Sequence, residues 1–226
     1  MYQLYIANKN YSSWSLRPWV LMRELDIPFV EHLLKFGEAS SWERYREISP
    51  TGKVPCLVGD LTVWDSLSIA EYLAERHPGV WPASPDARAW ARSAAAEMHA
   101  GFNDLRSRCS MSCGITVRLN EFTLGLEQDV ARLCALWNDG LERFGGPFLA
   151  GKAFGAVDAF FAPMAFRIRT YGLLLDENAG QYAARLLNLP SMRAWYADAL
   201  KETFRDESHE QETLQVGSVL EDLRSV

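Results

Sequence analysis

The chain has 226 residues and a formal net charge of −6, with 48% apolar and 23% charged residues. This composition excludes a disordered chain, and the acidic balance argues against a nucleic-acid binder, which needs a basic surface. No apolar run approaches the roughly 20 residues of a membrane-spanning helix and no signal peptide opens the sequence, so we expect a cytoplasmic protein without a membrane partner.

The first 77 residues predict a small α/β unit with the element order β-α-β-α-β-β-α. Aromatic and β-branched residues predict a strand over 2–7, and apolar residues near helical spacing predict a helix over 13–25. The later elements are expected as strands over 27–34, 53–58 and 61–64, with a turn at Gly59-Asp60, and as helices from Ser40 or Ser41 to Ile48 and from Asp65 or Ser66 to Arg76.

A segment rich in proline follows at 78–86 and predicts a linker. Beyond it the pattern indicates helices only, over 87–112 and about 121–144, and from near Ala156 and from Pro190. We therefore expect an all-helical domain over 87–226. The acidic tail from Arg205 either docks as a helix or frays, and the sequence leaves both open.

Two possible motifs, a phosphate-binding loop and a cysteine metal site, are incomplete in this sequence. The segment 146–153 matches the phosphate-binding pattern GxxxxGK[ST] except at its last position, where Ala153 has no hydroxyl to reach a magnesium ion. The cysteines form no CxxC pair and have no histidine ligand nearby: they are Cys56, Cys109, Cys113 and Cys134. We therefore expect no nucleotide site, no metal site and free thiols.

Three short segments carry the functional signal. YSSWSLR at 11–17 lies between the first strand and the first helix, SPTGKVP at 49–55 enters the third strand, and Asp65-Ser66 begins the third helix. In this order and spacing the chain resembles the glutathione transferases, and FGAVD at 154–158 is similar to the box that caps a core helix of their second domain. The serine signature is most similar to that of the zeta class and of bacterial transferase-like proteins with NYSSWSLRPW.

The resemblance implies a thioredoxin-like domain over 1–77 that binds glutathione as cosubstrate, followed by the helical domain. A free thiol with a pKa of about 8.5 is only about 3% ionised at pH 7, so such an enzyme must stabilise the thiolate. A hydroxyl donor at a helix N-terminus can do so. Alignment of the zeta signature makes Ser12 the hydroxyl that faces the sulfur and Ser13 the second candidate, although either serine could only cap the helix.

The same resemblance assigns the glutathione backbone to the other two segments. It implies a cis Val54–Pro55 bond that leaves the Val54 backbone free to pair with the cysteinyl part of glutathione. Asp65 and Ser66 would hold the γ-glutamyl end, and Lys53 would reach the glycyl carboxylate. The alternatives are an edge-strand proline, a plain helix cap and a solvated surface lysine.

The pocket for a small electrophile is expected between the two domains. Its candidates by position are Tyr11, Trp14, Met98, Phe102, Arg106 and Met111, and Arg106 or Arg108 could hold an anionic substrate. Trp14 stands where the zeta signature has cysteine. Because reduction through a mixed disulfide needs a thiolate on the protein, this departure disfavours redox activity, and it puts zeta-type isomerisation in doubt.

These observations predict a glutathione transferase that conjugates glutathione to a small electrophile. The resemblance further implies a homodimer. Two alternatives remain open: a glutathione-dependent cis–trans isomerase of the maleylacetoacetate or maleylpyruvate type, and a non-catalytic member of the fold that serves as a binding module.

Overall fold

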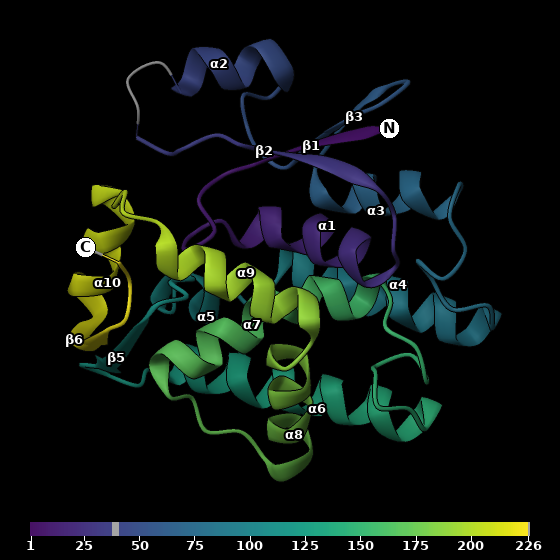
Figure 1. Ribbon diagram of the computed structural model, residues 1–226. Coiled ribbons are helices and arrows are strands. Elements are labelled where there is room, and N and C mark those ends of the chain that lie inside the picture. Colours follow the sequence, from purple (N-terminus) through teal and green to yellow (C-terminus); the bar gives the residue numbers. More distant parts are fainter. Residues whose placement is uncertain (38–40, 226) are drawn as a thin grey trace.

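The computed structural model describes residues 1–37 and 41–225 (Figure 1). The α/β domain contains β1 (Tyr2–Ile6), α1 (Ser13–Glu24), β2 (Phe29–Leu33), α2 (Ser41–Ile48), β3 (Cys56–Val58), β4 (Thr62–Trp64) and α3 (Ser66–Ala74). These elements follow the predicted order, and the two-domain fold, thioredoxin-like and then predominantly helical, is confirmed. The predicted cap of α2 at Ser40 or Ser41 lies outside the described side chains.

The sheet has the strand order β2-β1-β3-β4, with β1 parallel to β2 and antiparallel to β3. Leu4 and Ile6 are fully buried, as expected for alternate residues on the inner face of a strand. Helices α1 and α3 pack against each other below the sheet, while α2 lies above it (Figure 1). The short connection from β1 to α1 leaves the C-terminal end of β1 and contacts Trp195 and Ala199 of the second domain.

The second domain is built mainly from helices. They are α4 (Pro85–Ala100), α5 (Asn103–Arg108), α6 (Leu124–Phe144), α7 (Ala156–Tyr171), α8 (Glu177–Leu187), α9 (Pro190–Lys201) and α10 (Glu207–Val216). We place the domain boundary between α3 and α4. No helix in the described part of the chain is long and apolar enough to cross a membrane.

The prediction of helices only beyond the linker is wrong at one place. β5 (Ile115–Leu119) and β6 (Gly217–Asp222) pair as an antiparallel ribbon, with a register shift between Thr116 and Val117. The acidic tail is therefore docked, as α10 followed by a strand. Periodicity within the tail could not show this, because the partner strand lies about a hundred residues earlier in the sequence.

The single helix predicted over 87–112 is also wrong, because α4 ends at Ala100 and α5 begins at Asn103. A Cβ at Gly101 would lie 2.8 Å from the carbonyl oxygen of Glu97, and Phe102 takes a left-handed φ of 56°. Phe102 is buried edge-on to the ring of Phe161, 6.3 Å away between ring centres. Packing of this ring turns the chain where residue periodicity alone would continue the helix.

Helix α7 runs through the centre of the molecule, packed against α1, α4 and α8 (Figure 1). Its N-terminus is fixed by Asp158, which is fully buried and accepts from the backbone N–H groups of Leu149 and Gly155, each at 3.0 Å, and from the Tyr182 hydroxyl at 2.8 Å. Burial raises the pKa of Asp158 to about 6, so the carboxylate stays ionised at neutral pH.

The loop between β1 and α1 is anchored in the second domain. The Lys9 carbonyl accepts from the indole N–H of Trp195 at 2.8 Å, and the Asn10 side chain donates to the Ala199 carbonyl at 2.6 Å. The backbone N–H groups of Lys9 and Asn10 donate to the Glu202 carboxylate at 2.7 and 3.1 Å. Helix α9 therefore fixes the residues that immediately precede α1.

The C-terminal segment is attached to the same loop. The Tyr11 hydroxyl donates to Glu210 at 2.6 Å, and the buried Arg224 guanidinium bonds both Glu210 and Asp222. Burial alone would raise the pKa of Glu210, but hydrogen bonds from Arg224 and Tyr11 outweigh it and lower the pKa. We call the group Tyr11, Glu210, Asp222 and Arg224 the tail latch.

Replacing Asp158 by alanine should reduce the free energy of unfolding by about 3 to 5 kcal/mol, because two backbone N–H groups and the Tyr182 hydroxyl lose a buried partner. Urea unfolding measures this loss. The matched control is Asp176→Ala, which removes the N-cap of α8 and should cost about 1 kcal/mol. Equal losses for the two variants would show that Asp158 is no more than an ordinary cap.

Glu210→Gln should destabilise the protein by about 1 to 2 kcal/mol at pH 7, because it halves the charge that faces the buried Arg224. Since the folded-state pKa of Glu210 is lowered, its contribution is full above the ordinary value of 4.5 and is lost as the pH falls through the folded pKa. The difference in urea unfolding between wild type and variant should therefore shrink in acid. A constant difference from pH 7 to pH 3 would contradict the ion pair, and Glu207→Gln on the exposed face of α10 is the control.

Candidate functional site

Two cavities meet at Trp14, Lys53 and Val54, between the domains. The interdomain cavity, of about 520 Å³, is lined chiefly by Tyr11, Ser12, Ser13, Trp14, Phe36, Lys53, Arg106, Met111, Arg167, His209 and Glu212. The sheet groove, of about 460 Å³, is lined by Trp14, Thr51, Lys53, Val54, Pro55, Trp64, Asp65 and Ser66. Both volumes suit small-molecule sites. All seven residues predicted for the site line one of the two cavities.

Ser12 and Ser13 both line the interdomain cavity, but their hydroxyls differ in their partners. Ser12 precedes α1 and makes no capping hydrogen bond; its hydroxyl donates to the Ser15 hydroxyl at 2.7 Å. The Ser13 hydroxyl instead accepts from the Arg167 guanidinium at 3.3 Å. Ser13 thus keeps its own proton to donate to a ligand in the cavity, while the Ser12 proton is already used.

Arg167 brings a buried positive charge to this point. Its other terminal nitrogen donates to the carbonyls of Arg106, at 3.0 Å, and of Cys109. Burial lowers its pKa to about 10, which leaves the guanidinium charged at neutral pH. Its hydrogen-bond partners among the described residues are therefore two carbonyls and one hydroxyl, all of them neutral.

Trp14 lines both cavities, and two further arginines lie over its ring. The guanidinium carbons of Arg17 and Arg106 lie 4.2 and 5.0 Å from the centre of a Trp14 ring, distances that suit cation–π interactions. Burial, with the nearby charges of Arg106 and Arg167, lowers the pKa of Arg17 to about 9. The concentration of arginines makes this part of the molecule electropositive, although the whole chain is acidic.

The sheet groove has the predicted backbone. The Val54–Pro55 peptide bond is cis, and no hydrogen bond among the described residues uses the Val54 backbone. At its far side Asp65 caps α3, accepting from the Leu67 N–H at 2.7 Å, and the Arg17 guanidinium donates to the Ser66 hydroxyl at 3.3 Å. The cap that was the alternative for Asp65 is therefore present.

The second carboxylate oxygen of Asp65 lies 3.4 Å from Nε2 of His99. This oxygen does not take part in the cap, which uses the other one. Asp65 thus holds the start of α3 with one carboxylate oxygen and contacts His99 with the other.

The position-based candidates for the electrophile pocket divide into two groups. Tyr11, Trp14, Arg106 and Met111 line the interdomain cavity. Met98 and Phe102 do not, because they belong to the hydrophobic core, and Arg108 lies outside the cavity and faces Glu121 at 3.9 Å. For Phe102 and Arg108 the break between α4 and α5 explains the difference, since it rotates residues after Gly101 relative to a continuous helix.

Several cavity residues were not predicted, among them Phe36, Arg167, His209 and Glu212. Phe36 and the tail residues carry no sequence signal for this site. Arg167 carries one, since it is a charged residue between the apolar run FFAPMAF and Ile168. An arginine on a buried helix face points to a fixed partner or a ligand.

No described cysteine lines either cavity, and the four thiols are free. Burial raises the pKa of Cys109 and of Cys113 to about 12. The described residues also contain no cluster of three or more metal-ligating side chains. The polar side chains of the two cavity walls therefore include hydroxyls, guanidiniums, carboxylates, the Lys53 ammonium and, in the interdomain cavity, the His209 imidazole.

Comparison with known proteins agrees with this geometry. Residues 11–76 match the model of the glutathione S-transferase N-terminal domain. A glutathione S-transferase-like protein, OpS6, of Beauveria bassiana is 28% identical over 213 residues, which cover 88% of this chain and 90% of the relative. A probable maleylacetoacetate isomerase of Caenorhabditis elegans is 34% identical over 107 residues, 46% of this chain and 49% of the relative.

Among solved structures, a glutathione transferase homologue from Burkholderia with bound glutathione superposes with a TM-score of 0.67 at 22% identity. It covers 88% of this chain and 97% of its own. The matched segment 11–76 contains both serines and the whole sheet groove. Residues 11–76 therefore belong to the glutathione S-transferase N-terminal domain family, and the whole chain has the two-domain fold of a glutathione transferase-type enzyme.

Proposed function

We propose that this protein binds glutathione along the sheet groove with its sulfur at the start of α1. The Val54 backbone pairs with the cysteinyl residue, Lys53 reaches the glycyl carboxylate, and Asp65 with Ser66 holds the γ-glutamyl end. The free Val54 backbone next to the cis proline, and Lys53 in the wall of both cavities, support this placement. The bound glutathione of the Burkholderia homologue supports the same ligand.

The observation that carries the proposal is the environment of the Ser13 hydroxyl. This hydroxyl accepts a hydrogen bond from the Arg167 guanidinium, and Ser13 lines the interdomain cavity. Because Arg167 occupies an acceptor position of this hydroxyl, its proton is free to donate to a thiolate. A shift of the thiol pKa by about 2 units requires roughly 2.7 kcal/mol and makes about 75% of the thiol ionised at pH 7. A hydroxyl polarised by a buried cation can supply much of this. Ser12 is the second donor.

The reaction that follows is attack of the thiolate on a small electrophile held in the interdomain cavity. Orientation of the two reactants and stabilisation of the thiolate supply most of the catalysis. The family resemblance supports a homodimer as the form in which this takes place.

A glutathione-dependent isomerase is the second candidate. The arginines support it, because Arg106 and Arg167 provide positive charge for the carboxylates of a maleyl-type diketo acid. The partial similarity to the probable maleylacetoacetate isomerase supports it as well. Assays with two substrates, a neutral aryl halide and a cis-enedione carboxylic acid, distinguish the two functions. Conjugation of the first indicates a transferase, and catalytic isomerisation of the second without consumption of glutathione indicates an isomerase.

Ser13→Ala should raise the pKa of the bound glutathione thiol by about 1 to 2 units, because it removes a charge-assisted hydrogen bond. Ser12→Ala should raise it by less than about half a unit, since the Ser12 proton already goes to Ser15. Ultraviolet absorbance of the thiolate, titrated from pH 5 to pH 9, measures both shifts.

The matched control for these variants is Ser107→Ala. Ser107 lines the same cavity, but its hydroxyl donates to the Asn103 carbonyl of its own helix at 2.7 Å. It should leave the thiol pKa unchanged. A larger shift in Ser12→Ala than in Ser13→Ala would assign the donor to Ser12, and an unshifted thiol in the wild type would reject thiolate stabilisation altogether.

Arg106→Met should raise the KM for a carboxylate-bearing electrophile about tenfold and leave that for a neutral electrophile of the same size within about twofold. The reason is that the Arg106 guanidinium stacks on Trp14 in the cavity wall, and its hydrogen-bond acceptors among the described residues are the neutral carbonyls of His99 and Gly101. Steady-state kinetics with the two substrates provide the comparison. An equal effect on both would show that Arg106 only supports the wall.

A further inference from the structure

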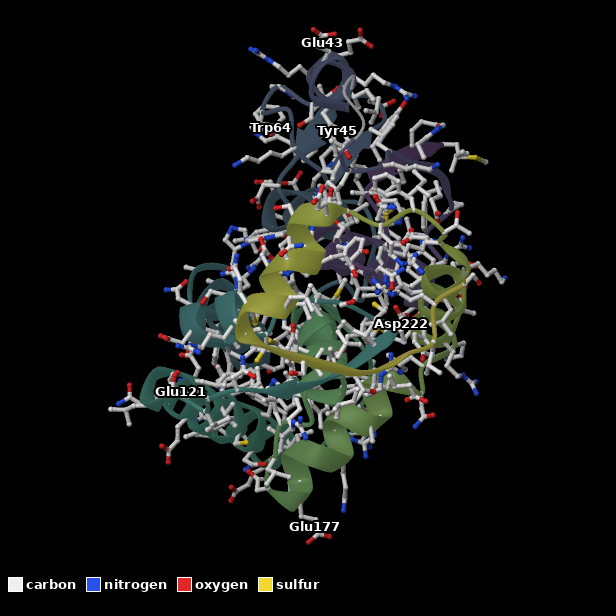
Figure 2. The ribbon with its side chains drawn as sticks, turned by 90° about the vertical axis from the view of Figure 1, so that its left-hand side faces the viewer. Glu43, Tyr45, Trp64, Glu121, Glu177 and Asp222 are labelled. Carbon is white, nitrogen blue, oxygen red and sulfur yellow. The ribbon has the colours of Figure 1, made fainter. Side chains whose placement is uncertain are left out.

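The first turn of α10 places a carboxylate–imidazole pair in the wall of the interdomain cavity. Nδ1 of His209 lies 2.6 Å from Oδ2 of Asp206, and Asp206 is almost fully buried. His209 lines the cavity together with Ser12 and Ser13. Figure 2 shows the yellow C-terminal helix in front, across the junction between the domain that carries Tyr45 and Trp64 and the helical domain below.

The contact with Asp206 decides which nitrogen of His209 carries a proton. An ionised carboxylate can only accept, so Nδ1 holds the hydrogen and the neutral ring keeps its lone pair on Nε2. No hydrogen bond among the described residues uses Nε2. The ring is held in place because it stacks on Tyr11 and Phe36, with centres 5.0 and 5.2 Å apart.

We propose that His209, oriented by Asp206, is a catalytic proton acceptor for the glutathione thiol, an assignment that rests on the proposed function. The S–H bond breaks, its electron pair stays on sulfur, and Nε2 takes the proton. When the sulfur adds to an activated carbon–carbon double bond, the imidazolium returns the same proton to the carbanion that forms. The two steps together add S–H across the double bond without any other reactant.

The charges around the ring are balanced in a way that permits this transfer. Asp206, Glu210 and Glu212 on α10 favour the imidazolium, with Asp206 in direct contact. Lys53, Arg106 and Arg167 in the facing walls oppose it, and Arg224 does so less because Glu210 and Asp222 already pair with it. Tyr11 stays neutral, since burial raises its pKa. The thiolate itself supplies the negative charge that completes the balance.

Asp206 has a structural task as well, because its Oδ2 accepts from the His209 backbone N–H at 3.2 Å and so caps α10. The two tasks can be separated. Asparagine caps helices as well as aspartate does, but it does not stabilise an imidazolium. Asp206→Asn therefore keeps the helix start and removes the charge.

The test counts protons released when glutathione binds. Calorimetric titration of the full chain at pH 7.5, in buffers of different ionisation enthalpy, gives this number, and thiolate absorbance gives the fraction of thiol that ionises. In the wild type the released protons should fall well below the thiolate fraction, because His209 retains them. In His209→Gln the two numbers should be equal, and the rate of addition to an activated alkene should drop about a hundredfold.

Three controls accompany the measurement. S-methylglutathione, which has no thiol proton, should release the same number of protons from wild type and variant. Asp206→Asn should move the proton count toward that of His209→Gln while circular dichroism and urea unfolding remain near wild type. Glu207→Gln, on the exposed face of the same helix, should change nothing.

Equal proton release and thiolate fraction in the wild type, unchanged in His209→Gln, would overturn the role of His209 and leave the glutathione site intact. Absence of saturable glutathione binding by the wild type would reject the proposed function, and the role of His209 with it. Loss of binding only in His209→Gln, with Asp206→Asn like wild type, would show that the ring is a packing element and not a proton acceptor.

Discussion

The structure depends on a buried lysine at the junction of its two domains. The Lys9 ammonium is almost fully buried and is paired with Glu31 on β2, at 2.9 Å, and with Asp198 on α9, at 2.8 Å. Its charge also lies above the rings of Trp19 and Trp195. Separation of the domains would remove Asp198, one of the two carboxylates that compensate the buried ammonium, and so would break an ion pair that links them. The serines follow within four residues, and their position is set by this contact.

Helix α7 connects the second domain to the chemistry of the first. Its N-terminus is fixed by the buried carboxylate of Asp158, and nine residues later Arg167 reaches Ser13 at the start of α1. Because α1 and α7 pack against each other, their packing sets the distance between the guanidinium and the hydroxyl. A buried cation is tolerated there because three protein oxygens accept from it.

The α/β domain and its groove could be predicted because their signals are local. Strand alternation, Pro55 and the cap at Asp65 each act within a few residues, and each of these residues sits at the end of a strand or the start of a helix. The interdomain cavity could not be predicted in the same way. Arg167 reaches Ser13, and His209 reaches the wall of the same cavity, only through tertiary packing, and pairing of β5 with β6 depends on a contact between distant segments. Phe102 breaks a helix that its own sequence favours.

The charge of the interdomain cavity restricts what it binds. Within the tail latch, Glu210 and Asp222 form ion pairs with Arg224. These two carboxylates of the acidic tail therefore neutralise Arg224 rather than the cavity arginines. Arg106 and Arg167 bond only to neutral oxygens among the described residues. The cavity wall therefore has more positive than negative side chains, in a chain whose net charge is −6. The remaining negative charge has to come from the ligand, first as the thiolate, and a substrate with a carboxylate of its own would gain further from the same two guanidiniums.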